Sequence, residues 1–286
     1  MFGQNKPTSK HYFSDMPENS LGIVSRFYTL QGEGPYSGMP ALFIRLSKCN
    51  LTCGFCDTYF NDMTIYSFDE LYDDGINCII NWREKNSSID NKDINDHKNW
   101  IKNNVGIVIT GGEPMLQENI KGFLEYVKDK FAWSQIESNG TIYSDIPEHT
   151  TLVCSPKAPK KKYIKPSLKY LNRADCLKFV VSSDENSPYY DIPDWAVEWS
   201  LKTKKPIYVS PMNIYKKEPE QSKILRMQNT ENDIITRSDV DEVISFWEDG
   251  LLDTTQNEKN HNRAGLLCMR YGFKLNLQVH LYASLP

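Results

Sequence analysis

Long apolar runs are missing from this sequence. No stretch approaches the roughly 18 consecutive apolar residues that mark a membrane span, and the polar opening "MFGQNKPTSKHYFSDMPENS" lacks the apolar core of a secretory signal. We therefore expect a cytoplasmic protein, in the host cytoplasm if the source is viral.

A large net charge is missing as well. The chain carries 37 acidic and 33 basic residues, which gives a formal charge of −4. Such a chain exerts no general attraction on phosphate backbones or anionic lipid. We expect neither nucleic acid nor a membrane as a partner, and an anionic ligand would need a local cluster of basic groups.

Cysteine is scarce and unevenly placed. The chain has 7 cysteines, and this odd number argues against a disulfide framework. Three of them, Cys49, Cys53 and Cys56, share the short segment "CNLTCGFC". In a reducing compartment such a cluster favours metal ligation. The scattered cysteines are predicted to be buried core thiols: Cys78, Cys154, Cys176 and Cys268.

The C-x3-C-x2-C spacing of the cluster favours iron and sulfur over zinc. A structural zinc site takes four protein ligands, and no second pair of cysteine or histidine ligands follows in the sequence. Three thiolates suit a 4Fe-4S cluster in which one iron lacks a protein ligand. That open iron could bind a small chelating substrate. A zinc or redox module without enzymatic activity remains the alternative.

Short apolar segments followed by polar loops recur along the chain. "GIVSRFYTL" and "ALFIRLS" flank a loop rich in glycine and proline, and "VGIVIT" is the continuous run typical of a buried parallel strand. Four further segments also end in polar loops: "SQIESNGT", "TLVCSPK", "CLKFVVS" and "PIYVSPMN". This order predicts an α/β fold with a mostly parallel sheet and a ligand at the carboxyl ends of its strands.

Two helices are predicted from their apolar spacing. "SFDELYDDGINCIINWREK" offers Ser67 as the N-cap and Glu70 three residues later, which is the pattern of a capping box. "MLQENIKGFLEYVKDKF" predicts a second amphipathic helix after "VGIVIT".

The domain organisation is predicted to be simple. Residues 1–20 form a loose arm, and residues 21–286 form a single domain. Polar composition predicts insertions near 60–104 and 214–264, the second with a helix in "SDVDEVISFWEDGLL".

The cysteine spacing resembles that of the radical S-adenosylmethionine superfamily. "TGGEP", residues 110–114, follows a predicted strand and resembles the loop that receives the methionine amino group in that superfamily. The resemblance implies a partial, modified (β/α) barrel, a 4Fe-4S cluster on the three cysteines, and S-adenosyl-L-methionine on the open iron. Phe55 matches an aromatic position near the adenine, and Glu113 supplies a carboxylate.

A narrower resemblance runs in order from about residue 22 to 286. "FYTLQGEGPYSGMPALFIRLSKCNLTCGFCDT", "TGGEPMLQ", "ESNGT", "CSPKA", "LKFVV", "SPMN" and "LNLQVHLYASLP" together resemble the 7-carboxy-7-deazaguanine synthases. This resemblance implies a lyase that converts 6-carboxy-5,6,7,8-tetrahydropterin to 7-carboxy-7-deazaguanine with loss of ammonia, through hydrogen abstraction at C6 by a 5'-deoxyadenosyl radical. It also implies a flavodoxin-like or other one-electron donor and a homodimer. A radical enzyme that activates a partner protein by forming a glycyl radical remains the alternative.

The same resemblance implies roles for individual residues. Arg45 would pair with the substrate carboxylate, and Thr58 would ligate Mg²⁺. The residues implied to bind substrate are Leu30, Gln31, Gly32, Glu33, Arg45, Thr110, His280 and the terminal carboxylate of Pro286. Those implied to bind S-adenosylmethionine are Phe55, Asp57, Gly112, Glu113, Ser138, Asn139, Ser155, Pro156, Lys157, Ser210, Pro211, Met212 and Asn213.

Two positions leave questions open. Asn213 stands where the family often has aspartate, which keeps an acceptor and predicts reshaped adenosine contacts. His280 could equally be a core imidazole. Its segment, "LNLQVHLYASLP", alternates like a strand and is predicted to dock on the domain.

Overall fold

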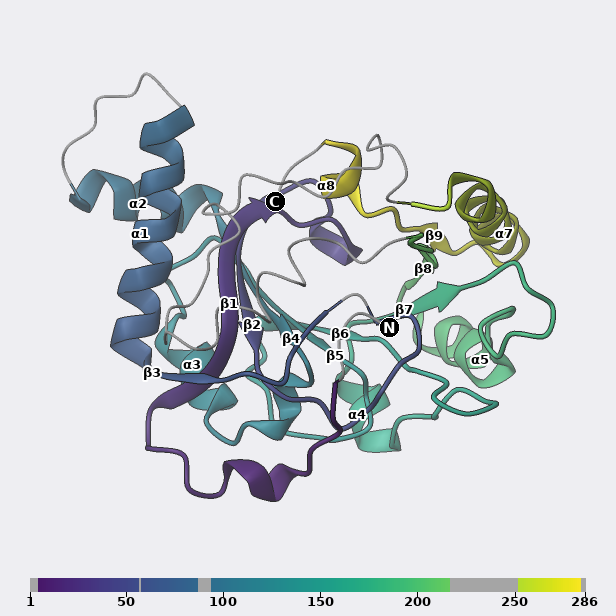
Figure 1. The fold of residues 1–286 in the computed structure, drawn as a ribbon, viewed down its shortest axis with the longest axis horizontal. Helices are drawn as coiled ribbons and strands as arrows, with labels where there is room; N and C mark the ends of the chain where they lie inside the picture. The colour runs from purple at the N-terminus through teal and green to yellow at the C-terminus, as the bar shows by residue number, and fades with distance from the viewer. Residues whose placement is uncertain (1–4, 57, 87–93, 217–251, 284–286) are drawn as a thin grey trace.

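The structure is a computed structural model, and it describes residues 5–56, 58–86, 94–216 and 252–283 (Figure 1). Nine strands form one sheet in the order β3-β1-β2-β4-β5-β6-β7-β8-β9. Their bounds are β1 Ser20–Leu30, β2 Pro40–Leu46, β3 Thr64–Ser67, β4 Gly106–Gly111, β5 Ser134–Ser138, β6 Thr150–Cys154, β7 Cys176–Val181, β8 Ile207–Pro211 and β9 Lys274–Leu275.

Every pairing from β2 to β9 is parallel, whereas β1 is antiparallel to both β2 and β3. The strands follow an arc from β1 to β9, with helices along its outer side (Figure 1). This arrangement confirms the predicted α/β class and is consistent with a partial barrel.

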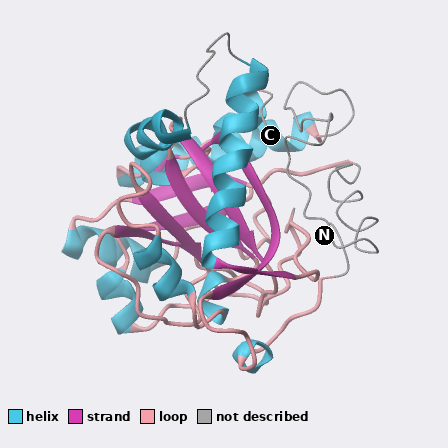
Figure 2. Ribbon diagram, turned by 90° about the vertical axis from the view of Figure 1, so that its left-hand side faces the viewer, coloured by secondary structure: helices cyan, strands magenta, loops and turns pink. Residues whose placement is uncertain are grey.

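Helices separate several of the parallel strands. Their bounds are α1 Phe68–Asn86, α2 Ile94–Asn104, α3 Ile120–Tyr126, α4 Leu168–Arg173, α5 Asp194–Thr203, α7 Thr254–Tyr271 and α8 Val279–Tyr282. The long α1 crosses in front of the sheet in the turned view (Figure 2). No helix of the described ranges has both the length and the apolar character that a membrane crossing requires.

The main core lies between the sheet and these helices. Ile44 of β2, Ile107 of β4 and Phe179 of β7 face it with at most 1% exposure, and Ile79 of α1 and Phe123 of α3 pack from the helical side. Burial of such side chains stabilises the fold by about 1.5–3 kcal/mol each. The core therefore anchors the strands whose carboxyl ends carry the polar loops.

The start of α1 is the predicted capping box. The backbone N–H of Glu70 donates to Ser67 Oγ over 3.3 Å, and Glu70 Oε2 accepts from the backbone N–H of Ser67 over 2.8 Å. The local sequence pattern thus forms as predicted.

The second predicted helix is shorter than expected. A 3-10 turn at Pro114–Leu116 interrupts the pattern, and α3 begins only at Ile120. Gln117 explains the break, because its side-chain amide exchanges two hydrogen bonds of 2.8 Å with the backbone of Gly22. This pairing with β1 holds Gln117 in an extended conformation.

The strand predicted at the C-terminal end is wrong beyond Leu275. Only Lys274–Leu275 pairs with β8, and Val279–Tyr282 forms a helical turn. Docking itself is confirmed, since Leu281 is 2% exposed. The backbone N–H of Asn276 still donates to the carbonyl of Val209 in β8 over 2.9 Å, and its side chain bonds to Gly34 in the loop after β1.

The N-terminal arm differs from the loose segment predicted for it. Phe13 is buried, and residues 5–8 bond to the cysteine loop. Within the segment predicted as an insertion near 60–104, Ile101 of α2 is fully buried in the main core. The helix predicted in 238–252 lies outside the described residues except for Leu252.

Candidate active site

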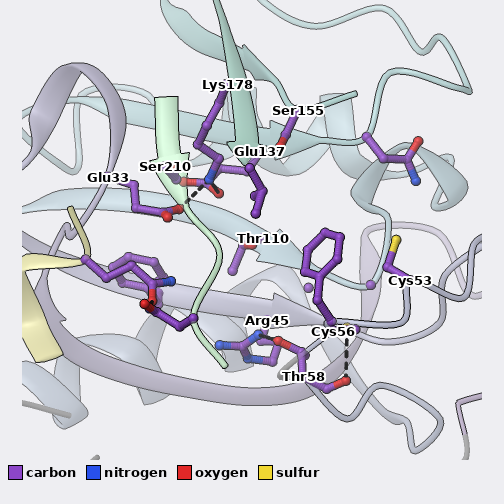
Figure 3. A pocket seen from close by; sticks show the side chains of 18 of the residues that line it. Glu33, Arg45, Cys53, Cys56, Thr58, Thr110, Glu137, Ser155, Lys178 and Ser210 are labelled. Carbon is purple, nitrogen blue, oxygen red and sulfur yellow. Dashed lines mark hydrogen bonds and ion pairs between the residues drawn. The ribbon is translucent and has the colours of Figure 1, made fainter. Parts of the chain in front are cut away.

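A cavity lies at the carboxyl ends of the parallel strands, where the sequence predicts the ligand (Figure 3). Residues of the cysteine loop, the "LQGEG" loop and the C-terminal turn complete its wall. The predicted site residues that line it are Gln31, Glu33, Arg45, Cys49, Cys53, Phe55, Cys56, Thr58, Thr110, Gly112, Ser138, Asn139, Ser155, Lys157, Ser210, Pro211, Asn213 and His280.

Other predicted residues do not reach this wall. Leu30, Gly32, Glu113, Pro156 and Met212 are not part of the lining. Asp57 and Pro286 lie outside the described residues. The structure therefore brings most of the predicted residues together, while their individual roles stay predictions.

All three clustered cysteines lie on the cavity wall. Cys49 is buried, whereas Cys53 and Cys56 are half-buried. Burial raises the pKa of Cys49 to about 12, and the charge of Glu113 adds to the shift. Burial also raises the pKa of Cys53, against the effect of nearby Lys157. Ligand thiols must lose their protons, so metal binding here releases protons.

The donor set fits a 4Fe-4S cluster, because cysteine thiolates are the protein ligands of such clusters. In a cubane cluster, each cysteine holds a different iron, so the thiols surround the cluster without meeting at a point. Three separate thiols on one wall match that requirement.

The two glycines of "TGGEP" fix the cysteine loop against β4. Gly111 has φ +146°, and a Cβ atom there would collide with the backbone of Leu46. A Cβ atom on Gly112 would collide with the carbonyl of Lys48. The N–H groups of Gly112 and Glu113 donate to Leu46 and Lys48 over 3.1 and 2.8 Å. Glycine is needed here because two backbones meet.

Glu113 holds the loop after β5. Its fully buried carboxylate accepts hydrogen bonds from Ser138 Oγ at 2.7 Å, from the backbone N–H of Asn139 at 2.7 Å and from that of Met115 at 3.0 Å. Burial raises the pKa of Glu113, while these hydrogen bonds act in the opposite direction. The Asn139 amide in turn donates to Asn50 Oδ1 within the cysteine loop, over 2.9 Å.

Arg45 and Thr58 form a polar pair at another part of the wall (Figure 3). Arg45 Nη1 donates to Thr58 Oγ1 over 2.7 Å, and the guanidinium lies 5.6 Å from the ring centroid of Phe27. Arg45, predicted to pair with the substrate carboxylate, and Thr58, predicted to ligate Mg²⁺, are thus neighbours. Phe27 stacks on Phe43, which also lines the cavity.

A buried ionic cluster was missed by the sequence analysis. Lys178 of β7 pairs with Glu33, and it pairs with Glu137 of β5 over 2.8 Å (Figure 3). Burial alone would lower the pKa of Lys178, but the two carboxylates raise it well above its usual value. A lysine inside the apolar segment "LKFVV" was the available signal, because lysine is almost never fully buried unless paired.

The C-terminal turn lies against the loop after β1. His280 lines the cavity beside Gly32, where a Cβ atom would collide with the imidazole. It is half-buried, which does not fit an enclosed core imidazole. Gln278, which the sequence analysis also missed, accepts a hydrogen bond of 2.6 Å from the amide of Asn213.

The fold and site define an α/β protein whose cavity is lined by three cysteines, an arginine and a buried ionic cluster. No family model matches the chain. The 7-carboxy-7-deazaguanine synthase of Rickettsia prowazekii is 36% identical over 184 residues, which is 64% of this chain and 70% of that protein. The enzyme of the same name from Rhodospirillum rubrum is 30% identical over 202 residues, which is 67% of this chain and 75% of that protein.

These similarities place the protein: the chain belongs to the family of 7-carboxy-7-deazaguanine synthases. Among solved structures, that of QueE from Escherichia coli aligns with a TM-score of 0.48 and 22% identity. The alignment covers 81% of this chain and 98% of that one.

Proposed function

We propose that this protein is a radical S-adenosylmethionine lyase. It would convert 6-carboxy-5,6,7,8-tetrahydropterin to 7-carboxy-7-deazaguanine with loss of ammonia. The observation that supports this most is one cavity that holds both the thiols Cys49, Cys53 and Cys56 and the polar pair Arg45 and Thr58. Family membership supports the same reaction.

The three cysteines would hold a 4Fe-4S cluster, and the strand-end loops would hold S-adenosylmethionine. When bound, the cluster and S-adenosylmethionine would supply the electron and the radical that removes a hydrogen atom from the substrate. The protein contributes position and the exclusion of water. Lys157, whose ammonium donates to Ser155 Oγ over 2.6 Å, lies on the wall near Cys53 and would bind the methionine carboxylate.

The other part of the wall would bind the pterin. Arg45 offers a planar guanidinium to the substrate carboxylate, which suits a bidentate pair. Thr58 would offer its hydroxyl to Mg²⁺, with substrate and water as further ligands. Glu33 and Glu137 would accept the N–H groups of the pyrimidine edge, and Lys178 holds both carboxylates in place.

The proposal also includes the location of the protein, its oligomeric state and its electron donor. The protein would work in the cytoplasm, as a homodimer, and would receive single electrons from a flavodoxin-like or other donor. The family resemblance is their support.

The test compares Cys53→Ala with Cys78→Ala, a control at a buried thiol of α1. After anaerobic reconstitution, iron and sulfide are counted. The proteins are then given the pterin, S-adenosylmethionine, Mg²⁺ and a reductant, and products are identified by mass. We expect wild type and Cys78→Ala to bind the cluster and form product, and Cys53→Ala to do neither. A wild-type protein that cleaves S-adenosylmethionine but leaves the pterin unchanged would favour the glycyl-radical alternative.

A further inference from the structure

A short segment before β1 contacts both ends of the cysteine loop. At the first end, Pro7 forms a parallel bridge with Cys49, and the N–H of Thr8 donates to the Cys49 carbonyl over 2.7 Å. At the second end, the N–H of Lys6 donates to Asn61 Oδ1 over 2.9 Å. We call residues 5–8 the N-terminal strap. It joins Cys49, the first of the three thiols, to a point of the chain that follows the third.

Asn5 binds the second end of the cysteine loop through two side-chain hydrogen bonds. Its amide nitrogen donates to the carbonyl of Thr58 over 2.7 Å, and its amide oxygen accepts from the N–H of Phe60 over 3.1 Å. A carboxamide is the side chain that offers a donor and an acceptor side by side. Asn5 is 7% exposed and Phe60 is 3% exposed, so water cannot easily replace these bonds.

Hydrogen bonds also join the residue before the cysteine loop, Lys48, to the residues that follow the loop, Phe60 and Asn61. Lys48 precedes the first cysteine with φ +65°, a left-handed conformation that is uncommon outside glycine. Its N–H donates to the carbonyl of Phe60 over 2.7 Å, and its ammonium bonds to the carbonyl of Asn61. That ammonium also lies 5.0 Å from the ring centroid of Tyr12, which follows the strap. The N-terminal segment thus packs against Lys48, a residue in an unfavourable backbone conformation.

Through Thr58, the strap reaches the cavity wall. Asn5 binds the carbonyl of Thr58, and Arg45 binds its hydroxyl over 2.7 Å. The Cys56 thiol lies 3.5 Å from the same carbonyl. Asn5 therefore binds the backbone of Thr58, while Arg45 binds its side chain. Because Thr58 lines the cavity, a shift of Asn5 would change the position of a cavity residue.

We propose that the N-terminal strap is a positioning element of the active site, and that Asn5 is its main positioning residue. Asn5 fixes the second end of the cysteine loop, which sets the spacing of the thiols and the place of Thr58. Only the cluster and coupling readouts of this proposal rest on the proposed function.

The first measurement uses the protein without iron. Asn5→Leu keeps the side-chain volume but removes both hydrogen bonds. The matched control is Asn119→Leu, because Asn119 ties Pro17 and Ser20 of the same N-terminal region to α3 without touching the cysteine loop. We expect amide exchange in peptides covering residues 49–61 to become about tenfold faster in Asn5→Leu, equivalent to about 1.4 kcal/mol. The same peptides in Asn119→Leu should exchange at the wild-type rate.

The second measurement uses the reconstituted protein. We expect Asn5→Leu to lose iron to a chelator several-fold faster than wild type. We also expect less product for each S-adenosylmethionine cleaved, because Thr58 and Arg45 shift relative to the cluster. Asn5→Asp keeps the acceptor for Phe60 and loses the donor to Thr58, so it should lower this coupling with a smaller change in iron release. It also carries the test if Asn5→Leu fails to fold.

Wild-type exchange rates and iron release in both Asn5 variants would overturn the proposal. Equal changes in Asn119→Leu would also overturn it, since they would make the strap a general stabiliser of the fold. Faster exchange in residues 49–61 of a protein whose wild type forms no product would support the strap while contradicting the proposed function.

Discussion

Lys178 projects from a strand into a cavity where two carboxylates meet its ammonium. Its side chain is 6% exposed, and those of Glu33 and Glu137 are 16% and 15% exposed. A buried charge is tolerated when it is paired, but removing one partner leaves the others uncompensated. Gln31 and Gln135 add hydrogen bonds of 3.3 and 3.0 Å to Glu137, which makes the cluster a connected network.

We expect Lys178→Met to lower the free energy of unfolding by about 3–5 kcal/mol, because it leaves two neighbouring carboxylates without their cation. Urea denaturation measures the loss. Lys121→Met, at an exposed ion pair with Asp145, is the control and should change stability little. Adding Glu137→Gln to Lys178→Met should restore part of the loss. A single-variant loss as small as that of the control would mean that water already solvates the cluster.

At the scale of elements, the joint between β3 and α1 depends on one local motif. β3 ends at Ser67, and α1 begins at the next residue. The reciprocal bonds of Ser67 and Glu70 satisfy N–H groups that a helix start leaves without partners. The hydrogen bonds from Ser67 also lower the pKa of Glu70 below its usual 4.5.

We expect Ser67→Ala to lower the free energy of unfolding by about 1 kcal/mol at neutral pH. Because the pKa of Glu70 is lower in the folded than in the unfolded state, its ionisation contributes stability above the unfolded value. That contribution is lost as the pH falls through the lowered value. The difference between wild type and Ser67→Ala should therefore shrink on acidification. Urea titrations at stepwise lower pH measure it, and a constant difference would exclude the Glu70 carboxylate from the cap.

Local patterns predicted much of the fold and part of the site. Strands with continuous apolar runs, the capping box and the cysteine loop depend on residues close in sequence, and each formed where expected. The shortening of α3 depends on Gln117 and Gly22, which are 95 residues apart. Lys178 and Glu33 are 145 residues apart. The spacing of residues in a short segment contains no information on contacts between such distant positions, so the sequence did not predict them.

At the scale of the whole molecule, Asn276 joins the loop after β1 to β8. Its side chain accepts a hydrogen bond of 2.6 Å from the N–H of Gly34 and donates one of 2.7 Å to Ser210 Oγ. Asn276 is 3% exposed, so both partners lack water as a substitute. Through this residue, the loop after β1 meets the chain that leaves β9, and the α8 turn lies near the end of β1 (Figure 1).

We expect Asn276→Leu to lower the free energy of unfolding by about 2–3 kcal/mol, because it leaves a buried N–H and a buried hydroxyl without partners. Amide exchange in peptides covering residues 31–36 should become faster. Asn276→Asp keeps the acceptor for Gly34 and should protect these residues better than leucine does. Equal protection in the two variants would show that the loop is held by other contacts.

The bond between Gly34 and Asn276 spans 242 residues, and this separation has a consequence for synthesis. At about 5–20 residues per second, a ribosome needs on the order of 10–50 s to travel between the two positions. The strap and the cysteine loop leave the ribosome early in that interval, before the C-terminal wall of the cavity exists. The three thiols are therefore synthesised well before Ser210, Asn213 and His280, which complete the cavity wall only near the end of translation.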